Sequence, residues 1–261
     1  MSAHLLPTAG RRVSPVVALL ALGTLAGCAA DTGARPAAAP GAAATLRVQP
    51  DGTHGAAVPA PARPALPARV PGLGPATRAR VPAQARQVLV VTGRAADSAD
   101  ATAVLWTRTG HGWRPGAAWP AHNALHGWSR DHWAGDLRSP IGVFTLTAAG
   151  GRLPDPGTGL PYSRSRAFST GGTGFTGEPL AGSFDYVVAI DYNRVPGTSP
   201  LDAAKPLGAS RGGGIWLHVD HGGPTHGCVS LTKDRMKQLL RALKPGQHPV
   251  VVMGDAHSLA S

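Results

Sequence analysis

Glycine and proline interrupt this chain so often that long helices have no room to form. The sequence contains 35 Gly and 25 Pro, which together are 60 of its 261 residues, and no long stretch lacks both. Because proline breaks a helix interior and glycine weakens it, a heptad-based coiled coil is excluded. Two cysteines cannot build a disulfide framework, and a chain of this length can bury a core without one.

Short apolar or β-branched runs, bounded by Gly, Pro, Asp and Asn, recur through the C-terminal two thirds of the sequence. Several of the gaps between them are too short for a helix, so the pattern predicts a mainly β fold. The predicted strands are Gln87–Thr92, Thr102–Arg108, Ile141–Thr147, Tyr186–Tyr192, Gly214–Val219, Cys228–Leu231 and Pro249–Met253.

One amphipathic helix is predicted directly after Thr232, a suitable N-cap, and Pro245 and Gly246 end it. Its apolar side chains recur at i, i+3, i+4 and i+7, which places them on one face: Met236, Leu239, Leu240 and Leu243. The predicted fold class is therefore mainly β, with a helix after Cys228.

The first 27 residues have the features of a lipoprotein signal peptide. Two arginines precede an apolar run over residues 13–27, which is too short to span a bilayer core. The run ends in Leu-Ala-Gly-Cys, which resembles a lipobox, so we expect Cys28 to be acylated and to become the mature N-terminus. The alternative is an ordinary signal peptide, cleaved near Ala30, with an idle thiol at Cys28.

The next segment is predicted to be a disordered linker. Between Ala29 and Arg69 lie fifteen Ala, seven Pro and four Gly, with no aromatic residue and no Ile. Such a composition buries too little apolar surface to offset its ordering entropy. The expected organisation is a signal peptide at 1–27, a linker at 28–69 and a folded catalytic domain at 70–261.

The net charge of +11 invites a nucleic-acid interpretation, which the distribution of charge argues against. No block of five like charges occurs, and an exported protein does not ordinarily meet nucleic acid. We expect no nucleic-acid partner, and an anionic cell envelope as the counterpart of the positive charge.

Reactive side chains gather between residues 217 and 231. Cys228 lies there with His218, His221 and His226. A nucleophilic thiol needs a base nearby and backbone amides free to hold an oxyanion, and Gly227 permits the sharp backbone turn that exposes such amides. Three alternatives stay open: an inert buried cysteine, a zinc site formed by these four side chains, and a thiol awaiting a disulfide.

Two separated motifs resemble one enzyme family. Thr225-His226-Gly227-Cys228-Val229, with a histidine on an upstream strand, resembles the S-H-G-C-[IV] signature of the YkuD-type L,D-transpeptidases, bacterial enzymes that build peptidoglycan cross-links. The segment 135–144, Gly-Asp-Leu-Arg-Ser-Pro-Ile-Gly-Val-Phe, resembles the family's G-D-x-[KR]-[ST]-P-x-G-x-F segment. The resemblance covers about Val70 to Asp255 and implies a mainly β domain with a helix after the catalytic cysteine.

The resemblance assigns roles residue by residue. Cys228 would be the acylated nucleophile and His218 its base, while His226 and Gly227 would shape the oxyanion pocket through their amides. No metal or organic cofactor is implied. The candidate substrate contacts are Thr225, Ser230, Arg138 and Asp220.

Two of these candidates depart from the family pattern, and a third has an alternative role. Thr225 replaces the usual serine and keeps its hydroxyl, whereas Ser230 stands where many members carry Arg or Asn. Asp220 shares a strand face with His218 and could orient that imidazole, but a solvated carboxylate is expected because i and i+2 side chains lie far apart.

The function expected from the resemblance is acyl transfer on peptidoglycan stem peptides through a cysteine thioester. The enzyme would work outside the cytoplasm, at the outer face of the membrane, through its lipid anchor. The alternatives are an L,D-carboxypeptidase with the same Cys/His pair, and a non-catalytic or zinc-binding wall-associated lipoprotein.

Overall fold

The structure is a computed structural model that describes residues 65–261. The predicted signal peptide, the predicted acylation site Cys28 and the predicted linker as far as residue 64 lie outside the described residues. Within the described part, no helix has the length and apolar character needed to cross a membrane.

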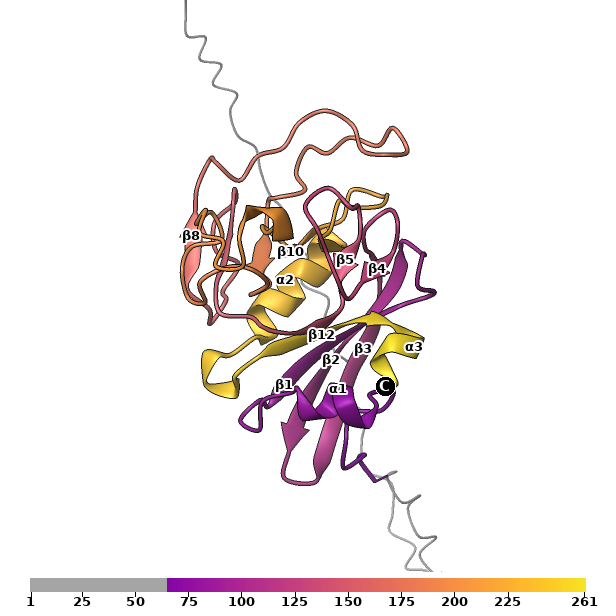
Figure 1. The fold of residues 1–261 in the computed structure, drawn as a ribbon. Coiled ribbons are helices and arrows are strands. Elements are labelled where there is room, and N and C mark those ends of the chain that lie inside the picture. Colours follow the sequence, from indigo (N-terminus) through magenta and orange to yellow (C-terminus); the bar gives the residue numbers. More distant parts are fainter. Residues whose placement is uncertain (1–64) are drawn as a thin grey trace, which may run out of the picture. The chain divides into compact units, whose positions relative to one another are not determined.

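The described chain is mainly β, as the sequence predicts (Figure 1). Ten strands form one sheet in the order β6-β12-β1-β2-β3-β11-β10-β9-β7-β8, and β4 pairs separately with β5. The strands are β1 (Gln87–Gly93), β2 (Asp100–Thr109), β3 (Gly112–His122), β4 (Trp128–Ser129), β5 (Ser139–Pro140), β6 (Gly142–Thr145), β7 (Ala149–Gly151), β8 (Tyr162–Arg164), β9 (Val187–Ala189), β10 (Trp216–Val219), β11 (Val229–Leu231) and β12 (Val250–Asp255).

All seven predicted strands are confirmed, although several are shorter than expected, and the long strand β3 was not predicted. Its sequence contains Pro115 and Pro120, which argue against a central strand. The structure accommodates both prolines because β3 pairs along its length only with β2 and touches β11 at a single position, His122 opposite Ser230.

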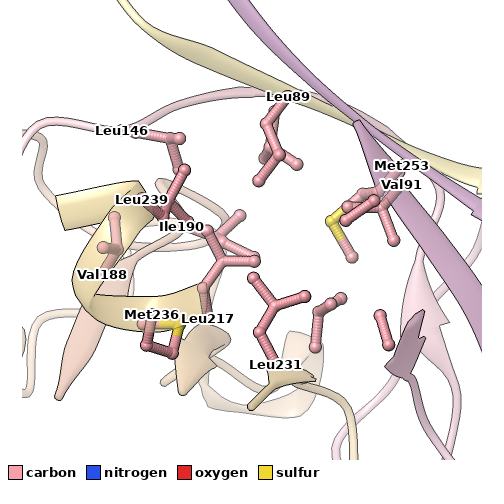
Figure 2. Close-up of a cluster of buried hydrophobic side chains, with 14 of the residues drawn as sticks. Leu89, Val91, Leu146, Val188, Ile190, Leu217, Leu231, Met236, Leu239 and Met253 are labelled. Atoms are coloured by element: carbon pink, nitrogen blue, oxygen red, sulfur yellow. The ribbon is translucent and has the colours of Figure 1, made fainter. Parts of the chain in front are cut away.

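The main hydrophobic core lies between the sheet and the helix α2 (Lys233–Ala242). Thr232 occupies the N-cap position, but its side chain makes no capping hydrogen bond. Met236, Leu239 and Leu240 are fully buried, which confirms the predicted apolar face of this helix. Figure 2 shows residues that meet in this core: Leu89, Val91, Val188, Ile190, Leu217, Leu231, Met236, Leu239 and Met253.

A second, smaller core covers the other face of β1 and β12. The short helix α3 (Ala256–Leu259) contributes to it, together with the segments on either side of α1 (Pro75–Ala79). The buried residues of this cluster include Val70, Leu73, Val88, Val90, Trp113, Val250, Val252 and Leu259.

Candidate active site

The pairing of β10 with β11 brings the predicted reactive residues together. These strands run parallel, with Leu217 opposite Val229 and His218 opposite Ser230. Because side chains alternate along a strand, His218 and Cys228 lie on one face of the pair. The other face, formed by Leu217, Val219, Val229 and Leu231, belongs to the main core.

Cys228 is partly exposed immediately before β11, and its sulfur contacts backbone groups. The N–H of Trp216 donates to Sγ at 3.4 Å, and the thiol donates to the carbonyl oxygen of Gly214 at 3.6 Å. The protein surroundings desolvate the sulfur and raise the pKa of the Cys228 thiol to about 11, against the opposing effect of the Trp216 N–H. The resting group is therefore a thiol at neutral pH.

His218 is buried, and its tautomer is fixed by the backbone. Its Nδ1 lies 2.9 Å from the carbonyl oxygen of Val219, and because a carbonyl oxygen only accepts, Nδ1 carries the proton and Nε2 is free to accept one. Burial lowers the pKa of His218 to about 4, so the ring is neutral. Among the described residues, no hydrogen bond joins this imidazole to Cys228.

Two hydroxyl groups hold the carbonyl oxygen of Cys228. Thr225 Oγ1 donates to it at 2.7 Å and Ser139 Oγ at 3.3 Å. Since Ser139 belongs to the upstream motif, the two sequence motifs meet at this carbonyl. Both side chains are buried, so the expected substrate contact through Thr225 has no support here: its hydroxyl points inward.

The backbone before Cys228 is closely packed and presents free amides. A Cβ on Gly227 would lie 3.0 Å from Ile215 Cδ1, so this position has little space for a side chain. The N–H groups of Gly227 and Cys228 donate to no acceptor among residues 65–261. His226 is exposed, and its ring lies 4.6 Å from that of Phe175.

Asp220 is bound to neighbouring side chains, so the expectation of a solvated carboxylate is wrong. Its Oδ1 accepts hydrogen bonds from His122 Nδ1 at 2.8 Å and from Ser230 Oγ at 2.7 Å. Burial opposes ionisation of this carboxyl, but the two hydrogen bonds outweigh it and lower the pKa of Asp220 to about 2. Ser230 is fully buried, so its expected substrate contact also lacks support.

The side chain of Arg138 hydrogen-bonds to a nearby backbone carbonyl group. Its N–H donates to Asp136 Oδ1 at 2.9 Å, and its guanidinium donates to the carbonyl oxygen of Trp128 at 3.3 Å. The carbonyl oxygen of Arg138 lies 3.5 Å from the position of a Cβ on Gly227, so the residue does adjoin the Cys228 loop.

Comparison with known proteins agrees with this geometry. The family model of the YkuD L,D-transpeptidase catalytic domain matches residues 81–252, well over half of the chain. The chain belongs to the YkuD family. This family is enzymatic and acts on cell-wall peptidoglycan. The match includes both motifs and all the strands from β1 to β11.

Similar solved structures are more distant. The structure of Bd1075 from Bdellovibrio bacteriovorus shares 17% identity and a TM-score of 0.37, over 66% of this chain and 48% of that one. The helical cell shape determining protein Pgp2 from Campylobacter jejuni shares 15% identity and a TM-score of 0.38, over 65% and 47%. This chain thus spans about half the length of each. No curated protein matches the sequence.

One residue that the sequence analysis did not single out, Glu178, contacts the candidate site. Glu178 Oε1 accepts a hydrogen bond from His221 Nδ1 at 3.1 Å, and both side chains are nearly buried. The His221 ring stacks on the His218 ring, 5.8 Å away and inclined by only 13°. Glu178 is the only glutamate in the sequence, which was the one available signal for it.

The four side chains of the alternative zinc site have other partners. Their partners are Glu178 for His221, Phe175 for His226, the carbonyl oxygen of Val219 for His218 and that of Gly214 for Cys228. Within residues 65–261, no three His, Cys, Asp or Glu side chains are grouped to hold a metal ion.

Proposed function

We propose that this YkuD domain is an L,D-transpeptidase that transfers acyl groups between peptidoglycan stem peptides through a Cys228 thioester. The observation that carries the proposal is the common face of β10 and β11. The Cys228 thiol and the His218 imidazole with its free Nε2 lie on that face, and in the adjoining backbone the N–H groups of Gly227 and Cys228 donate to no acceptor among residues 65–261. These are the groups that thiol-based acyl transfer requires.

In the first half-reaction, Cys228 attacks the carbonyl carbon of an L,D peptide bond at the third residue of a stem. The thiol proton passes to His218 Nε2 as the S–C bond forms, and the Gly227 and Cys228 amides stabilise the developing oxyanion. The C–N bond then breaks, and the imidazolium returns the proton to the departing D-alanine amine. A thioester remains on Cys228.

In the second half-reaction, an amine of a neighbouring stem attacks the thioester carbonyl. His218 takes a proton from that amine as the new C–N bond forms. The S–C bond then breaks and the imidazolium returns the proton to sulfur, so the thiol is regenerated and a new amide joins the two stems. Water in place of the amine would release a free carboxylate, which is the L,D-carboxypeptidase alternative.

The raised pKa of Cys228 and the lowered pKa of His218 favour a resting pair in which both groups are neutral. Proton transfer from sulfur to nitrogen therefore accompanies attack on the substrate. Because both side chains now bond to backbone groups, formation of the reactive pair requires the thiol to leave Gly214 and approach Nε2.

We further propose that the domain works outside the cytoplasm, tethered through acylated Cys28 and a linker over residues 28–69. The lipobox-like Leu-Ala-Gly-Cys sequence and the Ala/Pro-rich composition support this organisation. Peptidoglycan stems are then the available substrate, and nucleic acid is absent.

A carbapenem trap tests the catalytic proposal. The chain from residue 28, carrying Cys28→Ser, is incubated with a carbapenem and its intact mass is measured. We expect one covalent adduct, which Cys228→Ala abolishes. An unmodified mass in the folded parent chain would contradict the proposal. Digestion of peptidoglycan products then separates the two activities: dimeric muropeptides indicate transpeptidation, and trimmed monomers alone indicate the carboxypeptidase.

A further inference from the structure

A cavity of about 460 Å³ lies beside α1, away from the Cys228 loop. It has no lining residue in common with that loop, and Figure 1 shows α1 and β10 on opposite sides of β12 and β1. The proposed acyl transfer makes no use of it. Its apolar lining is formed by Val70, Leu73, Val81, Ala85, Val88 and Trp113.

Arginines supply all the charge at this cavity. Arg69, Arg78 and Arg108 line it, no Asp or Glu does, and none of these three forms an ion pair within residues 65–261. Arg69 and Arg108 are exposed. The imbalance extends along the chain, because residues 65–96 contain five arginines and no acidic residue. We call this feature the arginine-rimmed cavity.

The chemistry of the cavity selects an amphiphilic anion. Guanidinium groups bind phosphate through paired hydrogen bonds, and an apolar lining of this size accepts a hydrocarbon chain. A free phosphate would leave the apolar lining unused, and a neutral apolar ligand would leave the arginines without a counter-charge. A phospholipid with an anionic headgroup satisfies both parts.

The position of the cavity in the sequence points to the same ligand. Ala68 and Arg69 line it together with Val70, and they are the last two residues of the segment that we propose as the linker from acylated Cys28. The cavity therefore lies where the tether enters the domain, so a tethered domain would hold it close to the lipid surface.

We propose that the arginine-rimmed cavity binds an anionic phospholipid and docks the domain on the membrane. The arginines contact the headgroup phosphate and the apolar residues contact the upper part of an acyl chain. No bond is made or broken. This binding is independent of the Cys228 chemistry, so each proposal can fail without the other.

Vesicle sedimentation tests the proposal, with the chain from residue 28 carrying Cys28→Ser so that acylation contributes nothing. Binding to phosphatidylglycerol vesicles should be at least tenfold tighter than to phosphatidylcholine vesicles. Arg69→Glu with Arg108→Glu should weaken it at least tenfold. The matched control, Arg164→Glu with Arg166→Glu, makes the same charge change at two exposed arginines outside the cavity and should weaken it less than threefold.

Three results would overturn the proposal. Equal losses in the two double variants would mean that only net charge matters. Equal binding to the two kinds of vesicle would remove the need for an anionic lipid. Equally tight binding of polyphosphate, which has no hydrocarbon, would assign the arginines to an anionic polymer. If the Glu variant does not fold, as judged by its thermal unfolding, Arg69→Gln with Arg108→Gln should still weaken vesicle binding at least threefold.

Discussion

His218 and Cys228 lie on the same face of the β10–β11 pair, yet each is hydrogen-bonded to backbone groups and not to the other. Parallel pairing sets the common face, and two residues of offset along the strands separate the side chains. The strand pair thus sets the common face, and the backbone hydrogen bonds of each group hold the thiol and the imidazole in separate contacts. The local environment keeps both groups neutral until substrate arrives.

Alkylation of Cys228 should show a high thiol pKa. The pKa is raised above the ordinary value, so the reactive thiolate is scarce at neutral pH and its fraction grows as the pH rises toward about 11. We expect the rate of modification by iodoacetamide to increase continuously from pH 7 to pH 10 in the chain carrying Cys28→Ser. A plateau below pH 8 would instead indicate a preformed thiolate–imidazolium pair.

Removal of the Glu178 carboxylate should slow acylation. Glu178 holds His221, which stacks on the buried His218, so its loss frees the ring that packs on the proposed base. We expect Glu178→Ala to lower the rate of carbapenem acylation about tenfold or more, since small misplacements of catalytic groups are costly. Glu178→Gln should recover part of the rate, because its amide oxygen can still accept from His221.

The control for Glu178 is Asp97→Ala, which removes an exposed carboxylate far along the sequence from the site and should leave acylation unchanged. A purely structural role for Glu178 would lower thermal stability without changing the pH dependence of acylation. A positioning role predicts an altered pH profile, because the surroundings of His218 change. Equal rates in the parent chain and Glu178→Ala would contradict the proposed role.

The hydroxyl group of Thr225 should contribute more to stability and to the rate of acylation than its methyl group does. It donates to the Cys228 carbonyl, and Thr225→Val leaves that acceptor with the longer bond from Ser139 alone. We expect Thr225→Val to lower the free energy of unfolding by about 0.5–1.5 kcal/mol, the usual net contribution of one hydrogen bond, and to slow acylation. Thr225→Ser keeps the hydroxyl and should retain both stability and activity, as urea denaturation and carbapenem trapping would measure.

The sequence predicted the elements whose patterns are local. The helix α2 has four apolar residues at helical spacing, and the residues around Cys228 resemble a family motif, a resemblance that the family match over residues 81–252 confirms. The strand β3 was not predicted because its two prolines argue against a strand. They are tolerated because β3 pairs with β11 at only one position, and this pairing depends on the tertiary structure.

The hydrogen-bond partners of the polar site residues could not be predicted from the sequence, because they too depend on the tertiary structure. Asp220 bonds to His122, 98 residues away, and Glu178 bonds to His221 across 43 residues. No spacing rule relates such positions. The inward direction of Thr225 and Ser230 also depends on neighbours, since Ser139 and Asp220 come from other segments of the chain.

Asp220 should make the stability of the domain sensitive to acid. Its pKa in the folded state is about 2, below the ordinary value of 3.8, so its contribution is fully present above about pH 5 and is lost as the pH falls toward 2. The difference corresponds to about 2 kcal/mol. Urea denaturation at pH 6 and at pH 2.5 should therefore show a loss in the parent chain that exceeds the loss in Asp220→Asn by up to this amount, because the variant has no charge to lose at this position. Identical pH dependence in the two chains would show that the hydrogen bonds from His122 and Ser230 do not favour the ionised carboxylate.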